Sequence, residues 1–459
     1  MERILRNVTI LQRVSASPAR WCRVRKLQDT TTSQLVDASG NPIPVRFTLS
    51  WWKTTLSIPK DKWVRLFLPE GYPQTVHPFY LPFASWNFAQ MVFGSASGVL
   101  STQSILYGLG LSSDGLALSS TLNWILKDGL GQFGGIWIVS LIGGRFDVEP
   151  KRYHIFAVVL LIISCILEIL VPLAPHYFVL VASIANIFKN VSWMVTSATR
   201  AQIHKQFARH DNMGDITGKS AAQNTLASLI GTGLGIILST MFLSRGGVSP
   251  VEGVVKCLLV VVPLSLISLF ADYQSCLYAV STRLNLQRLD ILFYHSFTEL
   301  FGKTKVFNPS ILHSLSRYIL SPETVTKRES FVCSRRFNRL ASVMNNVPLY
   351  IEPPLKDTQL QCLEPDRSFW IEIDKGASLI SIWFDYYAND ETLFAGILTA
   401  CLLRYFIARG INGIALGKVE EIAQSLVEPY REALIKRGWS LDQVYLGTRH
   451  PLKITKNAD

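Results

Sequence analysis

The sequence predicts a mainly α-helical protein, in which a six-helix transmembrane bundle is followed by a small, soluble α+β domain. The 459 residues are 49% hydrophobic and only 17% charged. Their mean hydropathy of +0.25 is too high for an ordinary soluble enzyme and too low for a chain that lies in a membrane throughout. Between Glu70 and Asp114 there is no Asp, Glu, Lys or Arg. From about residue 321 the pattern changes to short β-type segments and shorter helices.

Residues 1–84 form a basic N-terminal segment. The first 28 residues contain one acidic residue, Glu2, and six Arg. Two interpretations stay open: an organelle transit peptide, or a basic tail on the cytosolic side of a membrane. No secretory signal is predicted, because no apolar core follows the first basic residues. The organelle stays open between mitochondrion, plastid and endomembrane.

Residues 85–280 form the predicted transmembrane domain. A helix needs about 20 mostly apolar residues to cross about 30 Å of hydrocarbon. The third and sixth segments are the clearest, whereas Ser and Gly dilute the first two. The six predicted spans are 86–110, 116–142, 154–174, 177–199, 221–243 and 255–279.

Loop charges predict the orientation of these spans. The connection after the second span contains Arg145 and Lys151, and the connection after the fourth contains Arg200 and Lys205. The alternate connections are nearly free of basic residues. The positive-inside rule therefore places both termini on the cytosol-equivalent side. The net charge of +12 fits this arrangement, so the predicted partner is a lipid bilayer and not a nucleic acid.

Small residues recur at the spacing of helix contacts. Lipid gives no hydrophobic drive for helix pairing, so small residues four apart let two backbones approach closely. They predict a tightly packed bundle, either generic or able to move. The candidate packing glycines are Gly94, Gly98, Gly131, Gly135, Gly231 and Gly235.

Four charges are singled out inside the predicted spans: Lys127, Asp128, Glu168 and Lys189. A lone charge in a membrane is costly, so each needs a partner or a wet cavity. Lys127 and Asp128 point about 100° apart on a helix, so we expect their partners on other helices. We predict a polar core that also includes Asn123. It is either a solute or proton pathway or a structural ion pair.

The connection between the fourth and fifth spans is the densest polar stretch. Asn, Asp and Gly favour turns, and here they stand beside fixed basic residues. The stretch is interpreted either as a gating or ligand-facing loop or as a loop whose charges serve topology. Its candidate residues are Arg200, Arg209, Asp211, Asn212, Asp215, Lys219, Gln223 and Asn224.

Three long motifs resemble the root UV-B sensitive (RUS) family. They are FLPEGYPQTVHPFYLPFASWN, TLNWILKDGLGQFG and TRAQIHKQFARHDNMGDITGKSAAQNTL, within a matched stretch from Arg65 to Asp290. The resemblance implies an integral membrane protein without established catalysis. It also implies a link to root ultraviolet-B responses, vitamin B6 status and auxin, as in plant members.

A looser likeness concerns the connection between the second and third spans. Gly143 to Asp147, followed by Lys151 and Arg152, looks like the loop signature of the major facilitator superfamily, although Val148 and Pro150 break it. Six spans would correspond to one half of such a transporter. By this analogy, a pathway needs either the six helices alone or a second, identical or homologous membrane subunit.

The C-terminal part is predicted as a helical linker, 281–330, and a soluble α+β domain, 331–459. Residues 369–374 and 378–384 have the pattern of two strands. Asn389 and Asp390 can cap a helix that runs to Ala408, whose uncharged core is too short to cross a bilayer. A second helix to about Lys436 and a strand near 443–448 complete the domain.

No catalytic motif, metal-ligand spacing or cofactor fingerprint is present in the sequence. We therefore expect no enzyme, no metal and no cofactor. The leading hypothesis is a transporter-like protein for a small, anionic metabolite with a cytosol-side regulatory domain. The alternative is a membrane scaffold whose C-terminal domain recruits a soluble protein partner.

Overall fold

The computed structural model describes residues 10–13, 21–26, 33–36, 66–112, 117–143, 146–147, 149–209, 211–242, 249–301, 315–331, 347–353, 367–374, 379–410 and 415–445. The chain divides into two compact units, Met1–Arg65 and Leu66–Asp459. Arg145 and Val148, which belong to the predicted loop signatures, lie outside the described residues.

The N-terminal unit contains a three-stranded antiparallel meander that the sequence analysis did not predict. Strand β2 pairs with both of its neighbours, with Ile10 opposite Val24 and Arg23 opposite Val36. The strands are β1 (Ile10–Arg13), β2 (Trp21–Lys26) and β3 (Ser33–Val36).

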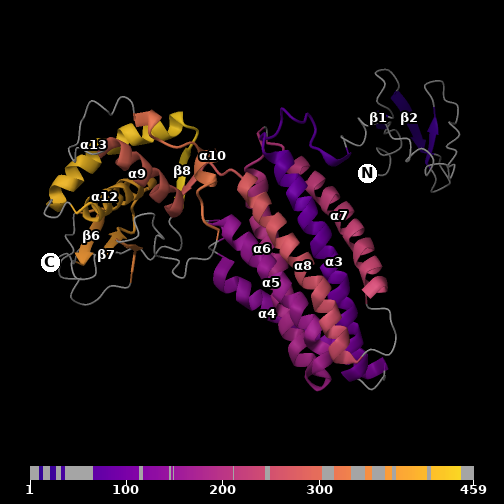
Figure 1. Cartoon of the computed structure of the whole chain (residues 1–459). Helices are drawn as coiled ribbons and strands as arrows, with labels where there is room; N and C mark the ends of the chain where they lie inside the picture. Colours follow the sequence, from indigo (N-terminus) through magenta and orange to yellow (C-terminus); the bar gives the residue numbers. More distant parts are fainter. Residues whose placement is uncertain are drawn as a thin grey trace, which may run out of the picture. The chain divides into compact units, whose positions relative to one another are not determined.

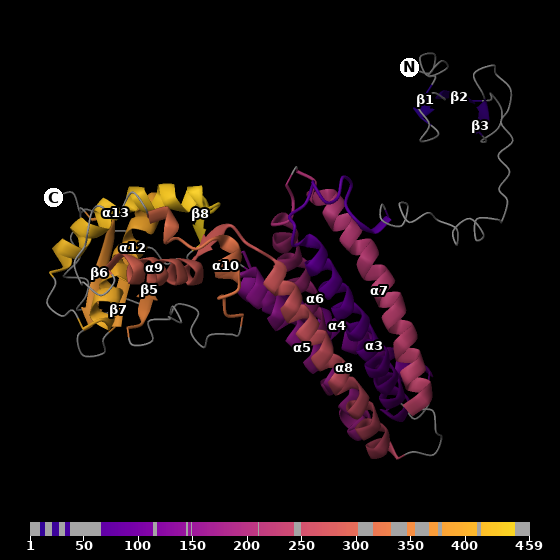
Figure 2. The same cartoon turned by 45° about the horizontal axis from the view of Figure 1, so that its top comes forward.

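The second unit begins with a bundle of long helices (Figures 1 and 2). At 1.5 Å per residue, each described helix of the bundle is about 30–50 Å long. They are α3 (Tyr80–Ser112), α4 (Ala117–Ile142), α5 (Pro150–Leu170), α6 (Phe178–Lys205), α7 (Met213–Phe242) and α8 (Pro250–Tyr278). Two 3₁₀ turns, η3 (Val171–Leu173) and η4 (Pro175–Tyr177), join α5 to α6.

Local sequence explains where these helices begin and end. Pro150 and Pro250 stand in the first turns of α5 and α8, where a missing N–H leaves no bond unmade. Ser249 caps α8, because its side chain accepts a hydrogen bond from the Glu252 N–H at 3.3 Å. Pro172 cannot continue α5, and the chain turns there.

The bundle consists of two groups of three helices. Helix α3 packs against α7 and α8, whereas α6 packs against α4 and α5. The groups meet mainly through α3, α5 and α8, and α6 touches α7 only sparsely. This arrangement leaves space between α6 and α7.

Glycines make the close helix contacts within each group. A Cβ on Gly235 of α7 would lie 2.9 Å from the Ala96 carbonyl oxygen of α3, and Gly231 is still tighter. On α4, Gly131 and Gly135 approach Asn186 and Asn190 of α6 equally closely. A Cβ on Gly94 would make ordinary van der Waals contact with Ser268 of α8, and a Cβ on Gly98 would meet no atom within 4 Å.

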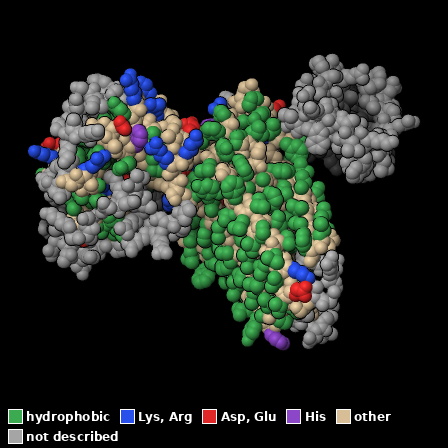
Figure 3. Space-filling model, in the orientation of Figure 1, with side chains coloured by type: hydrophobic (Ala, Val, Ile, Leu, Met, Phe, Trp, Pro, Cys, Tyr) green, Lys and Arg blue, Asp and Glu red, His purple; other side chains and the backbone are tan. Residues whose placement is uncertain are grey.

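The outside of the bundle is apolar (Figure 3). Large exposed side chains follow α4, α7 and α8, and they include Phe133, Trp137, Leu229 and Leu259. Soluble monomers rarely expose a contiguous apolar patch larger than a few hundred Å². This surface is therefore typical of a protein that is covered by lipid or by other protein.

Among the described helices, six are long and apolar enough to cross a membrane. Five of them overlap the predicted second to sixth spans. The predicted first span lies in α3, which its Ser, Gly and Gln residues make too polar to be included, although α3 is central to the bundle. The sixth is α12 (Asp390–Ala408) in the C-terminal domain, where 72% of its most apolar stretch is buried.

The segment before α3 packs against the end of the bundle. Val76, Tyr80 and Phe83 share a core with Ile203 and Phe207. The sequence analysis assigned 66–84 to the basic N-terminal segment, but the structure joins these residues to the helices.

The C-terminal domain is α+β. Strand β7 pairs in parallel with β5 and antiparallel with β6 (Figure 2). Strand β4 pairs in parallel with β8. Asn389 caps α12 through the Thr392 N–H at 2.8 Å, and Gly410 and Gly438 follow the two long helices at positive φ. The other elements are β4 (Arg283–Asn285), α9 (Leu286–Phe301), α10 (Pro322–Thr326), β5 (Leu349–Ile351), β6 (Phe369–Asp374), β7 (Leu379–Phe384), α13 (Leu416–Lys436) and β8 (Ser440–Tyr445).

Helix α9 belongs to the core of this domain, although its residues were predicted to form a linker. Phe293 and Phe297 stack on each other and meet the ring of Tyr430 edge-on. An amphipathic helix has an apolar face to bury, and here that face completes the core around α12. Burial also raises the pKa of Tyr430, whose hydroxyl donates to Ser296 Oγ at 2.6 Å.

Candidate functional site

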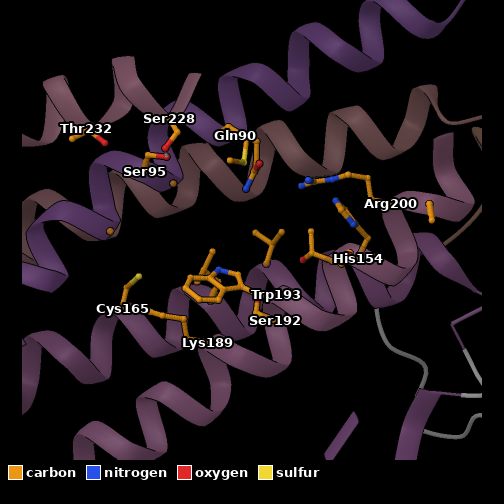
Figure 4. A pocket seen from close by; sticks show the side chains of 18 of the residues that line it. Gln90, Ser95, His154, Cys165, Lys189, Ser192, Trp193, Arg200, Ser228 and Thr232 are labelled. Atoms are coloured by element: carbon orange, nitrogen blue, oxygen red, sulfur yellow. Dashed lines mark hydrogen bonds between the residues drawn. The ribbon is translucent and has the colours of Figure 1, made fainter. Parts of the chain in front are cut away.

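A cavity of about 1000 Å³ lies inside the bundle between α3, α5, α6 and α7. It occupies the space between the two helix groups (Figure 4). The walls from α3 and α7 carry small and polar side chains, among them Gln90, Ser95, Ser228 and Thr232. Trp193 of α6 stands at the rim and is 59% exposed. A metabolite of modest size would fit this volume.

The charged side chains that line the cavity are all basic. Lys189 and Arg200 of α6 carry fixed positive charges, and His154 of α5 and His204 of α6 can be protonated. No Asp or Glu is among the lining residues. Residues 189 and 204 are about 22 Å apart along α6, so the basic groups follow the length of the cavity.

Lys189 stands at the end of this row opposite to His204, beside Cys165 in Figure 4. Its amino group donates to Glu168 Oε1, and Ser101 Oγ donates to Glu168 Oε2 at 2.6 Å. Glu168 is buried behind the wall. This group joins α3, α5 and α6, as expected of a polar core, and leaves Lys189 largely neutralised.

Arg200 differs from Lys189, because it makes no hydrogen bond or ion pair with any described residue. Its guanidinium extends into the cavity toward Gln90 (Figure 4). The carboxylate with which it interacts electrostatically is that of Asp272 on α8. Five N–H donors are therefore available at a half-buried site.

Asp272 is fully buried and faces His154. Its Oδ1 lies 3.2 Å from His154 Nε2, but neither oxygen makes a well-aligned hydrogen bond with the described residues. The other ring nitrogen, Nδ1, lies 2.9 Å from Thr199 Oγ1. Of the pair, His154 lines the cavity, and Asp272 does not.

Lys127 and Asp128 behave differently from the prediction. They neutralise each other, since Lys127 Nζ lies 2.5 Å from Asp128 Oδ1 and 4.2 Å from the centre of the Trp124 ring. The long, flexible lysine side chain thus reaches its sequence neighbour, although the two Cα–Cβ bonds point about 100° apart. Asn186 of α6 also donates to Asp128 at 3.1 Å. Neither charge lines the cavity, and nor does Asn123.

Three of the eight predicted gating-loop residues hold the segment before α3. Asn212 donates to the Thr75 carbonyl at 3.1 Å, and Gln223 donates to the Phe67 carbonyl at 2.6 Å. Asp215 accepts the Glu70 N–H at 2.7 Å. Two of the three family-like motifs thus contact each other. The gating role of the eight loop residues stays a prediction.

The remaining loop residues have separate places. Asn224 accepts a 2.8 Å hydrogen bond from Asn87 of α3. Asp211 has a positive φ of 51° in the turn, and Arg209 is exposed. Burial and the nearby Arg209 charge lower the pKa of His77. Lys219 lies on α7 outside the cavity lining, so Arg200 is the predicted loop residue that reaches the cavity.

Sequence reasoning missed His154, His204 and Asp272. Asp272 lies within the predicted sixth span, and an intramembrane carboxylate is a functional candidate by default. That signal was available in the sequence. The two histidines stand near span ends, where nothing in the sequence distinguishes them from interface residues.

A buried ion triad connects the bundle to the segment that leads into the C-terminal domain. Glu329 pairs with Lys151 of α5 at 2.8 Å and with Arg288 of α9. Burial alone would raise the pKa of Glu329, but Arg288 and Lys151 outweigh it and hold that pKa below its ordinary value. Lys151 stands one turn before His154, so the triad lies close to the cavity wall.

Comparison with known proteins gives the chain a family. Residues 54–299, more than half of the chain, match a family model described as "Vitamin B6 photo-protection and homoeostasis domain". Root UVB sensitive 6 of Arabidopsis thaliana is 35% identical over 38% of this chain and 35% of its own length. Root UVB sensitive 2, chloroplastic, from the same plant is 38% identical over 40% of this chain and 42% of its own length.

A relative outside plants, RUS family member 1 of Dictyostelium discoideum, is 33% identical over 38% of this chain and 34% of its own length. The chain thus spans less than half the length of these three relatives. No solved structure matches it significantly. The family model and the relatives agree with the three motifs, and the chain belongs to the root UV-B sensitive family.

Proposed function

We propose that this protein is a membrane-embedded, transporter-like carrier that binds a small anionic metabolite in the cavity of its helical bundle. The observation that carries the proposal is the lining of the cavity, in which every charged group is basic and Arg200 makes no hydrogen bond or ion pair with the described residues. Its N–H donors face the cavity from a half-buried position. An anionic ligand would accept hydrogen bonds from these donors.

The outside of the bundle supports the membrane location. Helices of about 30–50 Å with exposed Phe133, Trp137 and Leu259 match the thickness and polarity of a bilayer. The two helix groups stand on either side of the cavity and touch sparsely at α6 and α7. A relative movement of the groups would open the cavity to one side or the other, as alternating access requires.

The family description suggests a first ligand to test. It refers to vitamin B6, whose phosphorylated forms combine an anionic phosphate with a flat pyridine ring. Arg200 can bind a phosphate with two parallel hydrogen bonds. Trp193 at the rim offers an aromatic face for the ring.

Calorimetric binding of pyridoxal 5′-phosphate to the purified full chain in detergent tests the proposal. We expect saturable binding that Arg200→Gln weakens by about 10–100-fold, because a charge-assisted hydrogen bond contributes about 1.5–3 kcal/mol. Arg209→Gln, at an exposed position outside the cavity, is the matched control and should bind normally. Equal affinities in all three proteins, or no binding, would contradict the proposal and favour the scaffold alternative.

A further inference from the structure

His154 and Asp272 form a buried pair of titratable side chains beside Arg200. Asp272 is 0% exposed, and His154 is also buried. The Nε2 and Oδ1 atoms lie 3.2 Å apart without a well-aligned hydrogen bond. A fully buried carboxylate without any hydrogen bond is unusual, so its function needs an explanation.

The neighbours of His154 determine which ring nitrogen carries the proton. The hydroxyl group of Thr199 has one proton to donate. Its Oγ1 lies 2.8 Å from the Val195 carbonyl oxygen and donates to it. When Thr199 donates to that carbonyl, its Oγ1 accepts from His154 Nδ1, which lies 2.9 Å away. In this arrangement the Nε2 lone pair of a neutral imidazole faces the Asp272 carboxylate. One proton added at Nε2 would replace this repulsion with an attraction across 3.2 Å.

The charges around the pair come close to balance without that proton. Arg200 provides one positive charge opposite Asp272, and His204 lies farther along α6. From the other side, Lys151 and Arg288 share the single carboxylate of Glu329, and Cys276 follows Asp272 by one turn. The cavity walls from α3 and α7 are uncharged.

We propose that the His154–Asp272 pair takes up one proton when an anion binds at Arg200, so that the anion and the proton enter the cavity together. The proton comes from solvent and is placed between Nε2 and Oδ1. An anion that binds Arg200 neutralises its positive charge, so this charge no longer compensates the Asp272 carboxylate. The added proton then restores the charge balance of the pair in a site that is poorly solvated. This inference rests on the proposed function, since it needs an anion in the cavity.

Calorimetry of pyridoxal 5′-phosphate binding in buffers of different ionisation enthalpy counts the protons that accompany binding. We expect His154→Gln to bind the ligand while taking up about one proton fewer than the wild type. The difference between the two proteins cancels protons exchanged by the ligand itself. His176→Gln, the same substitution at an exposed histidine, should take up as many protons as the wild type.

Asp272→Asn provides a second variant if His154→Gln does not fold. Without the carboxylate, the anion alone neutralises Arg200, so proton uptake should again fall by about one. Binding with the same proton count in the wild type and in a folded variant of the pair would overturn the inference and leave the anion site intact. Absence of binding to the wild type would instead overturn the proposed function.

Discussion

Two arginines, one fully buried and one half-buried, show how differently the two helical regions of this protein use a charge. Arg404 in the C-terminal core is 0% exposed. It donates to Asp290 at 2.7 Å and to the Val347 carbonyl at 2.8 Å. Arg200 in the bundle points into a cavity and makes no bond to the described residues.

The difference distinguishes a structural charge from one that is available to a ligand. Around Arg404, aromatic and aliphatic side chains pack without space, so the pair is sealed and fixes α12 against α9. Around Arg200, small side chains on α3 and α7 keep a space open. No described residue accepts a hydrogen bond from the N–H donors of Arg200, so these donors can bind a ligand.

Replacing the two arginines should therefore separate stability from binding. We expect Arg404→Leu to destabilise the protein by about 3–5 kcal/mol, because it leaves Asp290 buried and uncompensated. Arg200→Gln should change stability by less than about 1 kcal/mol. Thermal unfolding of both full-length variants in the same detergent measures this. A similar loss of stability in both would show that Arg200 is a structural charge too.

Glu329→Gln should cause the next largest loss, about 3 kcal/mol, since Lys151 and Arg288 would share no counter-charge. Its pKa in the folded state lies below the ordinary value of 4.5. The stabilisation is therefore complete above about pH 4.5 and is lost as the pH falls through the folded-state pKa.

Unfolding temperatures measured between about pH 6 and about pH 3 test the sign of this dependence. The wild type should lose more stability than Glu329→Gln over that range. A parallel decline of the two proteins would mean that the triad does not hold its carboxylate ionised.

Gly231→Ala should have the smallest of these effects on stability, about 1–3 kcal/mol, through overpacking. Its new methyl group would collide with the Val92 carbonyl of α3, whereas a methyl group at Gly233, on the same helix, would meet nothing within 4 Å. Gly233→Ala should be neutral or slightly stabilising, because Ala favours helix. Unfolding curves in detergent compare the two variants directly, and equal behaviour would argue against tight packing of α3 and α7.

Much of the fold could be predicted because it depends on local patterns. Long apolar runs, caps and following glycines located five bundle helices, β6, β7, α12 and α13, although the predicted fifth span, 221–243, omits the first eight residues of α7. The role of α9 could not be read from its own sequence. An amphipathic face shows that burial is needed, but the partner, here α12, is more than 80 residues away.

The candidate site was only partly predictable, for the same reason. Glu168 and Lys189 stand out as charges in apolar spans, and the structure brings them together. Lys127 and Asp128 stand out equally but pair with each other beside α6. The cavity depends on how α6 and α7 diverge, which no pattern within either helix reveals.

Thiol labelling of Thr196→Cys on the cavity wall tests most directly whether the cavity selects anions. The rate with an anionic methanethiosulfonate should exceed the rate with a cationic one by on the order of tenfold, relative to a free thiol, because basic walls concentrate anions. Pyridoxal 5′-phosphate should slow the reaction, and Arg200→Gln should remove the preference. Labelling resolved by peptide mass spectrometry, with the exposed Ser425→Cys as reference, measures both effects. Equal relative rates for the two reagents, unchanged by the ligand, would contradict an anion site in the bundle.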